Sequence, residues 1–274
     1  ALVPRDFSSG TLRLNVDRLE LRRPDEATDP ASGTSLDPRR VPALAVAATT
    51  LVYNEIDFGA AEITTVRHSD GLELTQLKLR SDALTLDANG RWDHNEGQQT
   101  SHFDIDVQSA TLAGLLERFG YNVANIEQGE TDIHIAASWP GTPFEFSLAQ
   151  MTGNFELHVT DGRFLDIEPG GGRLFGLLSL QSLPRRLSLD FDDLFRKGFA
   201  FDDIQGVFKL ENGNAYTNSL LMSGPSARID ITGRTGLADT DYDQHMVVTP
   251  ALSSSLPVAA ALFGPIGVGA GAVY

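Results

Sequence analysis

Cysteine is absent from this chain of 274 residues. Its absence excludes disulfide bonds, thiolate metal ligands and cysteine nucleophiles. Positive charge is also scarce, because 21 lysines and arginines stand against 37 aspartates and glutamates, giving a formal net charge of -16. Repulsion between like charges excludes nucleic acid as a partner, and it disfavours docking on anionic lipid head groups. Any contact with lipid therefore has to be made through acyl chains.

Long apolar runs are missing as well, since no stretch of about 20 uninterrupted apolar residues marks a transmembrane helix. Residues 253–274 come nearest, but glycines and Pro265 interrupt them. We expect this stretch to be an apolar C-terminal tail that has been cut short. Residues 1–10 are expected to be a cloning remnant or a linker, because Leu2-Val3-Pro4-Arg5 matches the left half of a thrombin cleavage site.

Alternation of apolar and polar residues is abundant, and this period of two is typical of strands with one buried and one solvated face. The alternating apolar positions include Leu12, Leu14, Val16, Leu72, Leu74, Phe103, Ile105, Val107, Ile133, Ile135, Phe155, Leu157, Val159, Ile229 and Ile231. Adjacent polar residues at Thr75 and Gln76 shift the phase and predict a bulge. Turn-forming pairs follow many of the strands: Asp70-Gly71, Asn89-Gly90, Asp161-Gly162 and Asn212-Gly213. The sequence therefore predicts a mainly β fold built as a long antiparallel sheet.

Three stretches break the alternation and predict short helices, near residues 110–119, 173–181 and 192–197. In the first, Leu112, Leu115, Leu116 and Phe119 share one helical face, and Ser109 is the expected N-cap. Residues 22–42 are rich in Asp, Pro, Ser and Arg, so they predict a mobile loop. We accordingly divide the chain into a first β segment, 11–107, and a continuing β segment with the helices, 108–252.

Catalytic motifs fail on spacing throughout the chain, and we predict neither an enzyme nor a cofactor. A carbohydrate-active enzyme using Asp190 or Asp193 is a remote third hypothesis, because such enzymes need two converging carboxylates. His102 shares a strand face with Asp104 and Asp106, and His134 shares one with Asp132, which leaves a cross-strand metal site as one interpretation. We favour the other, ordinary polar positions on the wet face of a sheet, and predict no metal.

The most specific signal lies in residues 170–204. From Gly176 the chain reads Gly-Leu-Leu-Ser-Leu-Gln-Ser-Leu-Pro-Arg-Arg-Leu, and it continues with Leu189-Asp190-Phe191 and Lys197-Gly198-Phe199-Ala200-Phe201-Asp202. The flanks add Trp139-Pro140-Gly141-x-Pro143 and Ser223-Gly224-Pro225-x-Ala227-x-Ile229. Together these motifs closely resemble the C-terminal region of the YhdP family, AsmA-like proteins of Gram-negative bacteria. Residues 22–42 depart from the family pattern.

The resemblance implies a periplasmic segment of a protein anchored in the inner membrane. Its elongated, curled β-sheet would form an apolar groove that conducts phospholipid acyl chains between the inner and outer membranes. The expected groove lining is Leu72, Leu74, Phe155, Leu157, Val159, Ile229 and Ile231, for which a closed core is the alternative. The alternative function is a structural or docking module of the cell envelope, which recruits an envelope protein at the outer membrane through the apolar tail.

Overall fold

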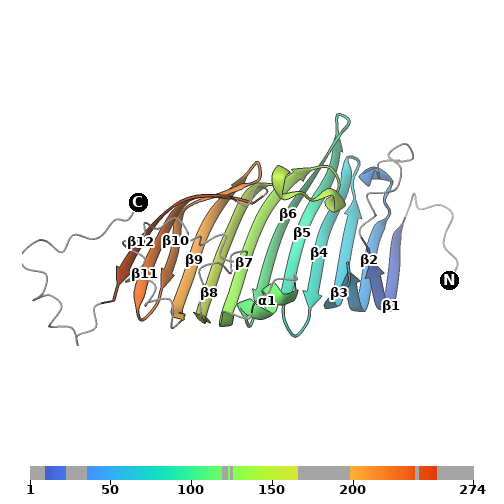
Figure 1. Ribbon diagram of the computed structural model, residues 1–274. Helices are drawn as coiled ribbons and strands as arrows, with labels where there is room; N and C mark the ends of the chain where they lie inside the picture. The colour runs from blue at the N-terminus through green and yellow to red at the C-terminus, as the bar shows by residue number, and fades with distance from the viewer. Residues whose placement is uncertain are drawn as a thin grey trace, which may run out of the picture.

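The computed structural model describes residues 10–22, 36–118, 123, 126–165, 198–237 and 241–251. Within these residues one sheet of twelve strands dominates, and its strands lie in sequence order from β1 to β12 (Figure 1). The strands are β1 (Thr11–Leu21), β2 (Ala43–Tyr53), β3 (Ile56–Arg67), β4 (Gly71–Arg80), β5 (Thr85–Asn95), β6 (Gln98–Ser109), β7 (Ile126–Pro140), β8 (Thr152–Phe164), β9 (Phe199–Glu211), β10 (Asn214–Ser223), β11 (Ala227–Gly236) and β12 (Tyr242–Pro250). The predicted mainly β fold is confirmed.

Every neighbouring pair of strands is antiparallel except β1 and β2, which run parallel from Thr11 beside Ala43. The expectation of antiparallel neighbours throughout is wrong for this pair. The physical reason is the connection through residues 22–42, which returns the chain to the starting end of β1, as a parallel pair requires. Part of that connection is described, and it includes the short helix η2 (Pro38–Arg40).

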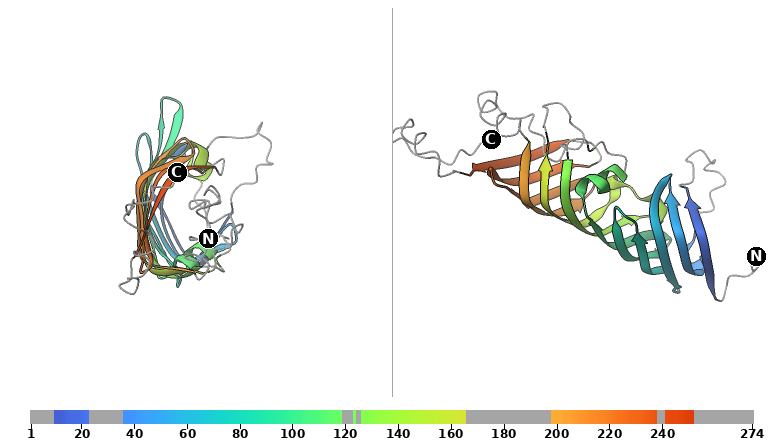
Figure 2. Two further views of the ribbon diagram at one scale, coloured as in Figure 1. Left: turned by 60° about the vertical axis from the view of Figure 1, so that its left-hand side comes forward. Right: turned by 90° about the horizontal axis from the view of Figure 1, so that it is seen from below.

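Bulges bend the sheet at several positions. The register of β4 against β5 shifts between Leu74 and Leu77, as the polar pair Thr75 and Gln76 predicted. Similar shifts occur in β2, β9 and β10 pairings. Because strands twist and each bulge adds to the twist, the sheet curls. Figure 2 shows the result, an elongated trough whose strands cross its wall and follow one another along its length.

Some of the predicted turns are confirmed by the structure and others are wrong. Asn212 and Gly213 join β9 to β10 with φ values of 48° and 77°, so that prediction is confirmed. The pairs Asn89-Gly90 and Asp161-Gly162 lie inside β5 and β8, so neither is a hairpin turn. At Gly90 a Cβ atom would overlap the carbonyl oxygen of His102 and the ring of Phe103. This glycine makes room for a neighbouring strand and does not turn the chain.

The helix α1 (Leu112–Arg118) confirms the first predicted helix, although Thr111 and not Ser109 caps it by accepting a hydrogen bond from the Gly114 amide. Leu115 is 4% exposed, and Arg118 donates a hydrogen bond to the carbonyl oxygen of Asp57 at the start of β3. The helix therefore braces β6 and β7 against β3 across the trough. No helix in the described part of the chain is both long and apolar enough to span a membrane.

Several predictions fall outside the described residues. They are the helices near 173–181 and 192–197, the tail 253–274, the first nine residues and most of the 22–42 loop. The described strands of the two predicted β segments belong to one continuous sheet.

Candidate functional site

One face of the sheet is apolar along almost its whole length. Residues directly opposite each other on neighbouring strands have side chains on the same face, so the strand register traces rows along the trough. One row runs through Leu14, Val46, Ile63, Leu77, Ala88, Ile105, Ile135, Phe155 and Phe208. The next row runs through Val16, Ala48, Ala61, Leu79, Leu86, Val107, Ile133 and Leu157. We call the face that holds these rows the inner face.

The inner face is the concave side of the trough. Leu115 of α1 is buried in one cluster with Leu51 of β2 and Leu84, while Val16 of β1 and Ile133 of β7 pack against the same cluster. Strands this far apart in the sheet can share a cluster only if the sheet curls toward this face. The trough thus has an apolar inside, and its outside carries the alternate, polar residues.

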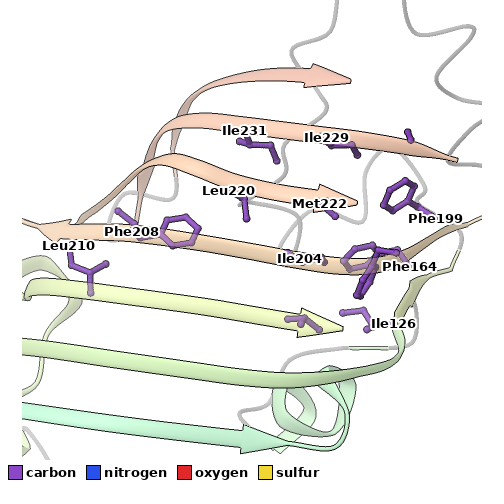
Figure 3. Close-up of a cluster of buried hydrophobic side chains, with 14 of the residues drawn as sticks. Ile126, Phe164, Phe199, Ile204, Phe208, Leu210, Leu220, Met222, Ile229 and Ile231 are labelled. Carbon is purple, nitrogen blue, oxygen red and sulfur yellow. The ribbon is translucent and has the colours of Figure 1, made fainter. Parts of the chain in front are cut away.

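Two buried clusters are joined by a half-buried stretch. One cluster gathers buried side chains of β7 to β11, and the other gathers buried side chains of β2 to β4 with Leu84 and with Leu115 of α1. Figure 3 shows part of the first, where Ile204 and Phe208 of β9 lie beside Leu220 and Met222 of β10. Between the clusters the apolar side chains are only partly buried: Leu72, Leu74, Leu77, Leu86, Ile105, Val107, Ile133, Ile135, Phe155 and Leu157. The described residues contain no second sheet to cover them.

The structure places all seven predicted groove residues on the inner face. Leu72, Leu74, Phe155 and Leu157 are half-buried, and each leaves part of its side chain accessible. Val159, Ile229 and Ile231 are 1%, 3% and 0% exposed, so these three are core residues in the described structure. Whether any of the seven contacts lipid remains a prediction.

Sequence reasoning missed the middle of this face. Ile105 and Ile135 face each other across β6 and β7, and Ile135 faces Phe155 across β7 and β8. Their alternation was visible, but alternation does not say which strands become neighbours. Glycines also shape this face, because a Cβ atom at Gly206 would lie 2.9 Å from both the Leu220 side chain and the Phe208 ring.

The outer face is polar and acidic, as the row Asp87, Asp106, His134 and Glu156 shows. A depression of about 810 Å³ lies mostly on this face, where charged side chains such as Asp132, His158 and Asp230 line it together with apolar ones such as Val207 and Leu221. Burying methylene groups against carboxylates gains little, so this hollow does not suit an acyl chain. The inner face is the better candidate for apolar ligands.

The expected histidine groupings differ from those observed. Nδ1 of His134 lies 2.9 Å from Oδ1 of Asp106, and its Nε2 lies 3.9 Å from Oδ2 of Asp104. These three residues are the only His, Asp or Glu group in the described chain that could surround a metal ion, and His102 is not part of it. Because both ring nitrogens already face carboxylates, charge pairing explains the arrangement.

The pKa of His134 is expected to lie above its ordinary value of about 6.5. The hydrogen bond to Asp106 is the main cause, and the charges of Asp104 and Glu156 add to it against the opposing effect of burial. The ion pair therefore stabilises the fold fully below pH ~6.5 and ceases to do so as the pH rises through the raised pKa. The side chain is 38% exposed, so solvent keeps the gain well under ~1 kcal/mol.

Nuclear magnetic resonance of the imidazole protons measures this titration directly. Asp106→Asn removes the main cause and should lower the midpoint of His134. A midpoint at or below the ordinary value in the unmodified chain contradicts the assignment.

Comparison with known proteins gives two findings. The family model described as YhdP protein matches residues 1–274. The intermembrane phospholipid transporter YhdP of Escherichia coli (strain K12) is 28% identical to this chain over 205 residues. That alignment covers 74% of this chain but 16% of the relative, so the chain spans a small part of the relative's length. No solved structure matches the chain.

Proposed function

The chain belongs to the YhdP family, whose model matches its whole length, and on this premise we propose that its inner face holds phospholipid acyl chains and conducts them between two membranes. The proposal places the chain in the periplasm of a Gram-negative cell, as a segment of a longer protein anchored in the inner membrane. It assigns the chain a binding role without catalysis. The name of the Escherichia coli relative, an intermembrane phospholipid transporter, supports the substrate class.

The observation that carries the proposal is the unbroken apolar row from Leu14 of β1 to Phe208 of β9. Nine strands spaced ~4.8 Å apart give this row a length of roughly 38 Å. The hydrocarbon of a whole bilayer is about 30 Å thick, so the row is longer than one acyl chain in a single leaflet. A chain can therefore move along the row without leaving apolar surroundings.

The free energy gained by burying an acyl chain also supports the proposal. Burial of an acyl chain is worth about 0.8 kcal/mol per methylene group, so a dozen buried groups give roughly 10 kcal/mol. Half-buried side chains such as Ile105 and Leu157 leave apolar surface for that contact. A chain of net charge -16 repels the phosphate of the head group, so the head group is expected to stay in water at the mouth of the trough.

The test is lipid content. Chain purified from bacteria without detergent is expected to release phospholipid on organic extraction, with mass spectrometry giving a reproducible molar ratio to protein. Chain stripped of lipid should take up a fluorescent phospholipid from vesicles. A folded chain that carries no phospholipid and accepts none contradicts the proposal.

A further inference from the structure

The connection between β7 and β8 exposes large apolar side chains. It contains the short helices η3 (Pro143–Glu145) and η4 (Leu148–Gln150), and we call residues 141–151 the loading loop. Phe144, Phe146 and Leu148 are 52%, 41% and 42% exposed, which makes this loop the densest group of exposed large apolar residues in the described chain. Exposed apolar groups gathered in this way indicate a contact surface.

Hydrogen bonds hold the loading loop in place. The Thr142 amide donates to Oε2 of Glu145 at 2.7 Å, and Nε1 of Trp139 donates to the Thr142 carbonyl oxygen at 3.0 Å. The hydroxyl of Ser101 on β6 donates to the Gly141 carbonyl oxygen at 3.0 Å. These bonds hold the backbone from Gly141 to Glu145, on which Phe144 is carried.

Aromatic contacts connect the loop to the inner face. The Phe146 ring meets Trp139 edge to face, with centroids 5.2 Å apart. Trp139 in turn stacks on Phe103, with centroids 5.3 Å apart and planes inclined by 16°. Phe103 lies opposite Gly90 of β5 in a row of the inner face, so apolar surface continues from the loop into the trough.

The loading loop carries little charge, and this limits the kinds of ligand that it can bind. Glu145 is the only charged residue in the loading loop, and its carboxylate accepts the Thr142 hydrogen bond. The loop has no lysine or arginine to attract phosphate, and its exposed large side chains are apolar, so hydrocarbon suits it better than a charged head group does.

We propose that the loading loop is the site where phospholipid acyl chains enter the trough. Phe144, Phe146 and Leu148 contact the hydrocarbon of a lipid layer, and an acyl chain passes along Phe146, Trp139 and Phe103 onto the inner face. This inference rests on the proposed function of the inner face. It adds the place of entry and the residues that provide it.

Contact with lipid can be measured by tryptophan fluorescence, because the chain contains only two tryptophans. Trp92→Phe leaves Trp139, which touches the loop, as the sole tryptophan. Vesicles of phosphatidylcholine with brominated acyl chains are expected to quench the fluorescence of Trp139, whereas unbrominated vesicles are not. If brominated vesicles do not quench the fluorescence of Trp139, the proposal is wrong. The same result is expected if the loop binds a protein partner instead of lipid.

Matched variants test the role of the loop in lipid uptake independently of the role of the trough. Phe144→Ser with Leu148→Ser keeps Phe146 on Trp139 and should slow phospholipid uptake from vesicles about tenfold or more, the factor given by losing roughly 1.4 kcal/mol of apolar contact. Val207→Ser with Tyr216→Ser is the control, because these residues are 50% and 42% exposed and share the outer face with polar neighbours. The control should take up lipid at the unmodified rate.

The outcomes distinguish the two proposals. If the loop variant takes up lipid at the unmodified rate, the entry site is wrong and the inner-face proposal stands. If the unmodified chain itself takes up no lipid, both are wrong. Slow uptake by the loop variant with an unchanged final lipid content supports entry through the loop.

Discussion

Leu157→Asp is expected to abolish phospholipid binding while the sheet remains folded. Leu157 lies near the middle of the inner face, opposite Ile133 on β7 and Gly206 on β9. Its side chain is half-buried, so an aspartate here reaches water when no lipid is bound. An acyl chain over the same position would strip that water from an unpaired charge, which costs several kcal/mol. This penalty offsets the gain from several buried methylene groups.

The measurement is the molar ratio of extracted phospholipid to purified protein, with circular dichroism to verify the fold. Leu157→Ala keeps the site apolar and should retain lipid. Val207→Asp places the same charge on the neighbouring strand but on the outer face, where the wild-type side chain is 50% exposed, and it should also retain lipid. Lipid at the unmodified ratio in Leu157→Asp contradicts an acyl-chain site on this face. Ile229 and Ile231 do not suit this test, because a charge at either buried position would unfold the chain.

The period of two in the sequence was enough to predict many of the strands and to indicate which apolar residues of a strand share a face. Within one strand, apolar residues two apart share a face, so Leu72 with Leu74 and Phe155 with Leu157 could be paired without knowledge of the neighbouring strands. The phase shift at Thr75 and Gln76 also correctly predicted the change of register between β4 and β5. Fold class follows from such local rules because they are the same in every strand.

Other features depend on distant contacts that no local pattern contains. The parallel pairing of β1 with β2 follows from the path of residues 22–42, and alternation is identical for either direction. Asn89-Gly90 has the composition of a turn, yet Gly90 is needed because the Phe103 ring lies against it. The exposure of Phe144 and Phe146 could not be predicted either, because it depends on where the connection between β7 and β8 packs.

Phe201→Ala is expected to lower the free energy of unfolding by about 3–5 kcal/mol, the usual cost of removing a buried phenylalanine ring. Phe201 is 2% exposed, its ring centroid lies 5.1 Å from that of Phe164, and it covers Gly162 of the adjacent strand. A typical domain is stable by about 5–15 kcal/mol. Such a loss should therefore lower the urea midpoint of unfolding by a large fraction of its unmodified value. Phe144→Ala removes the same ring from a position that is 52% exposed and should change the free energy of unfolding by less than ~0.5 kcal/mol.

A second substitution tests whether the loss comes from the cavity itself. A Cβ atom at Gly162 would overlap the ring of Phe201, so Gly162→Ala alone should destabilise the chain by overpacking. In the Phe201→Ala background the ring is gone and the new methyl group enters the vacated space, so the same substitution should recover part of the lost stability. The two changes should therefore be strongly non-additive in a double-mutant cycle. Additive effects, or an unchanged urea midpoint in Phe201→Ala, contradict the close contact between β8 and β9 that fixes this end of the trough.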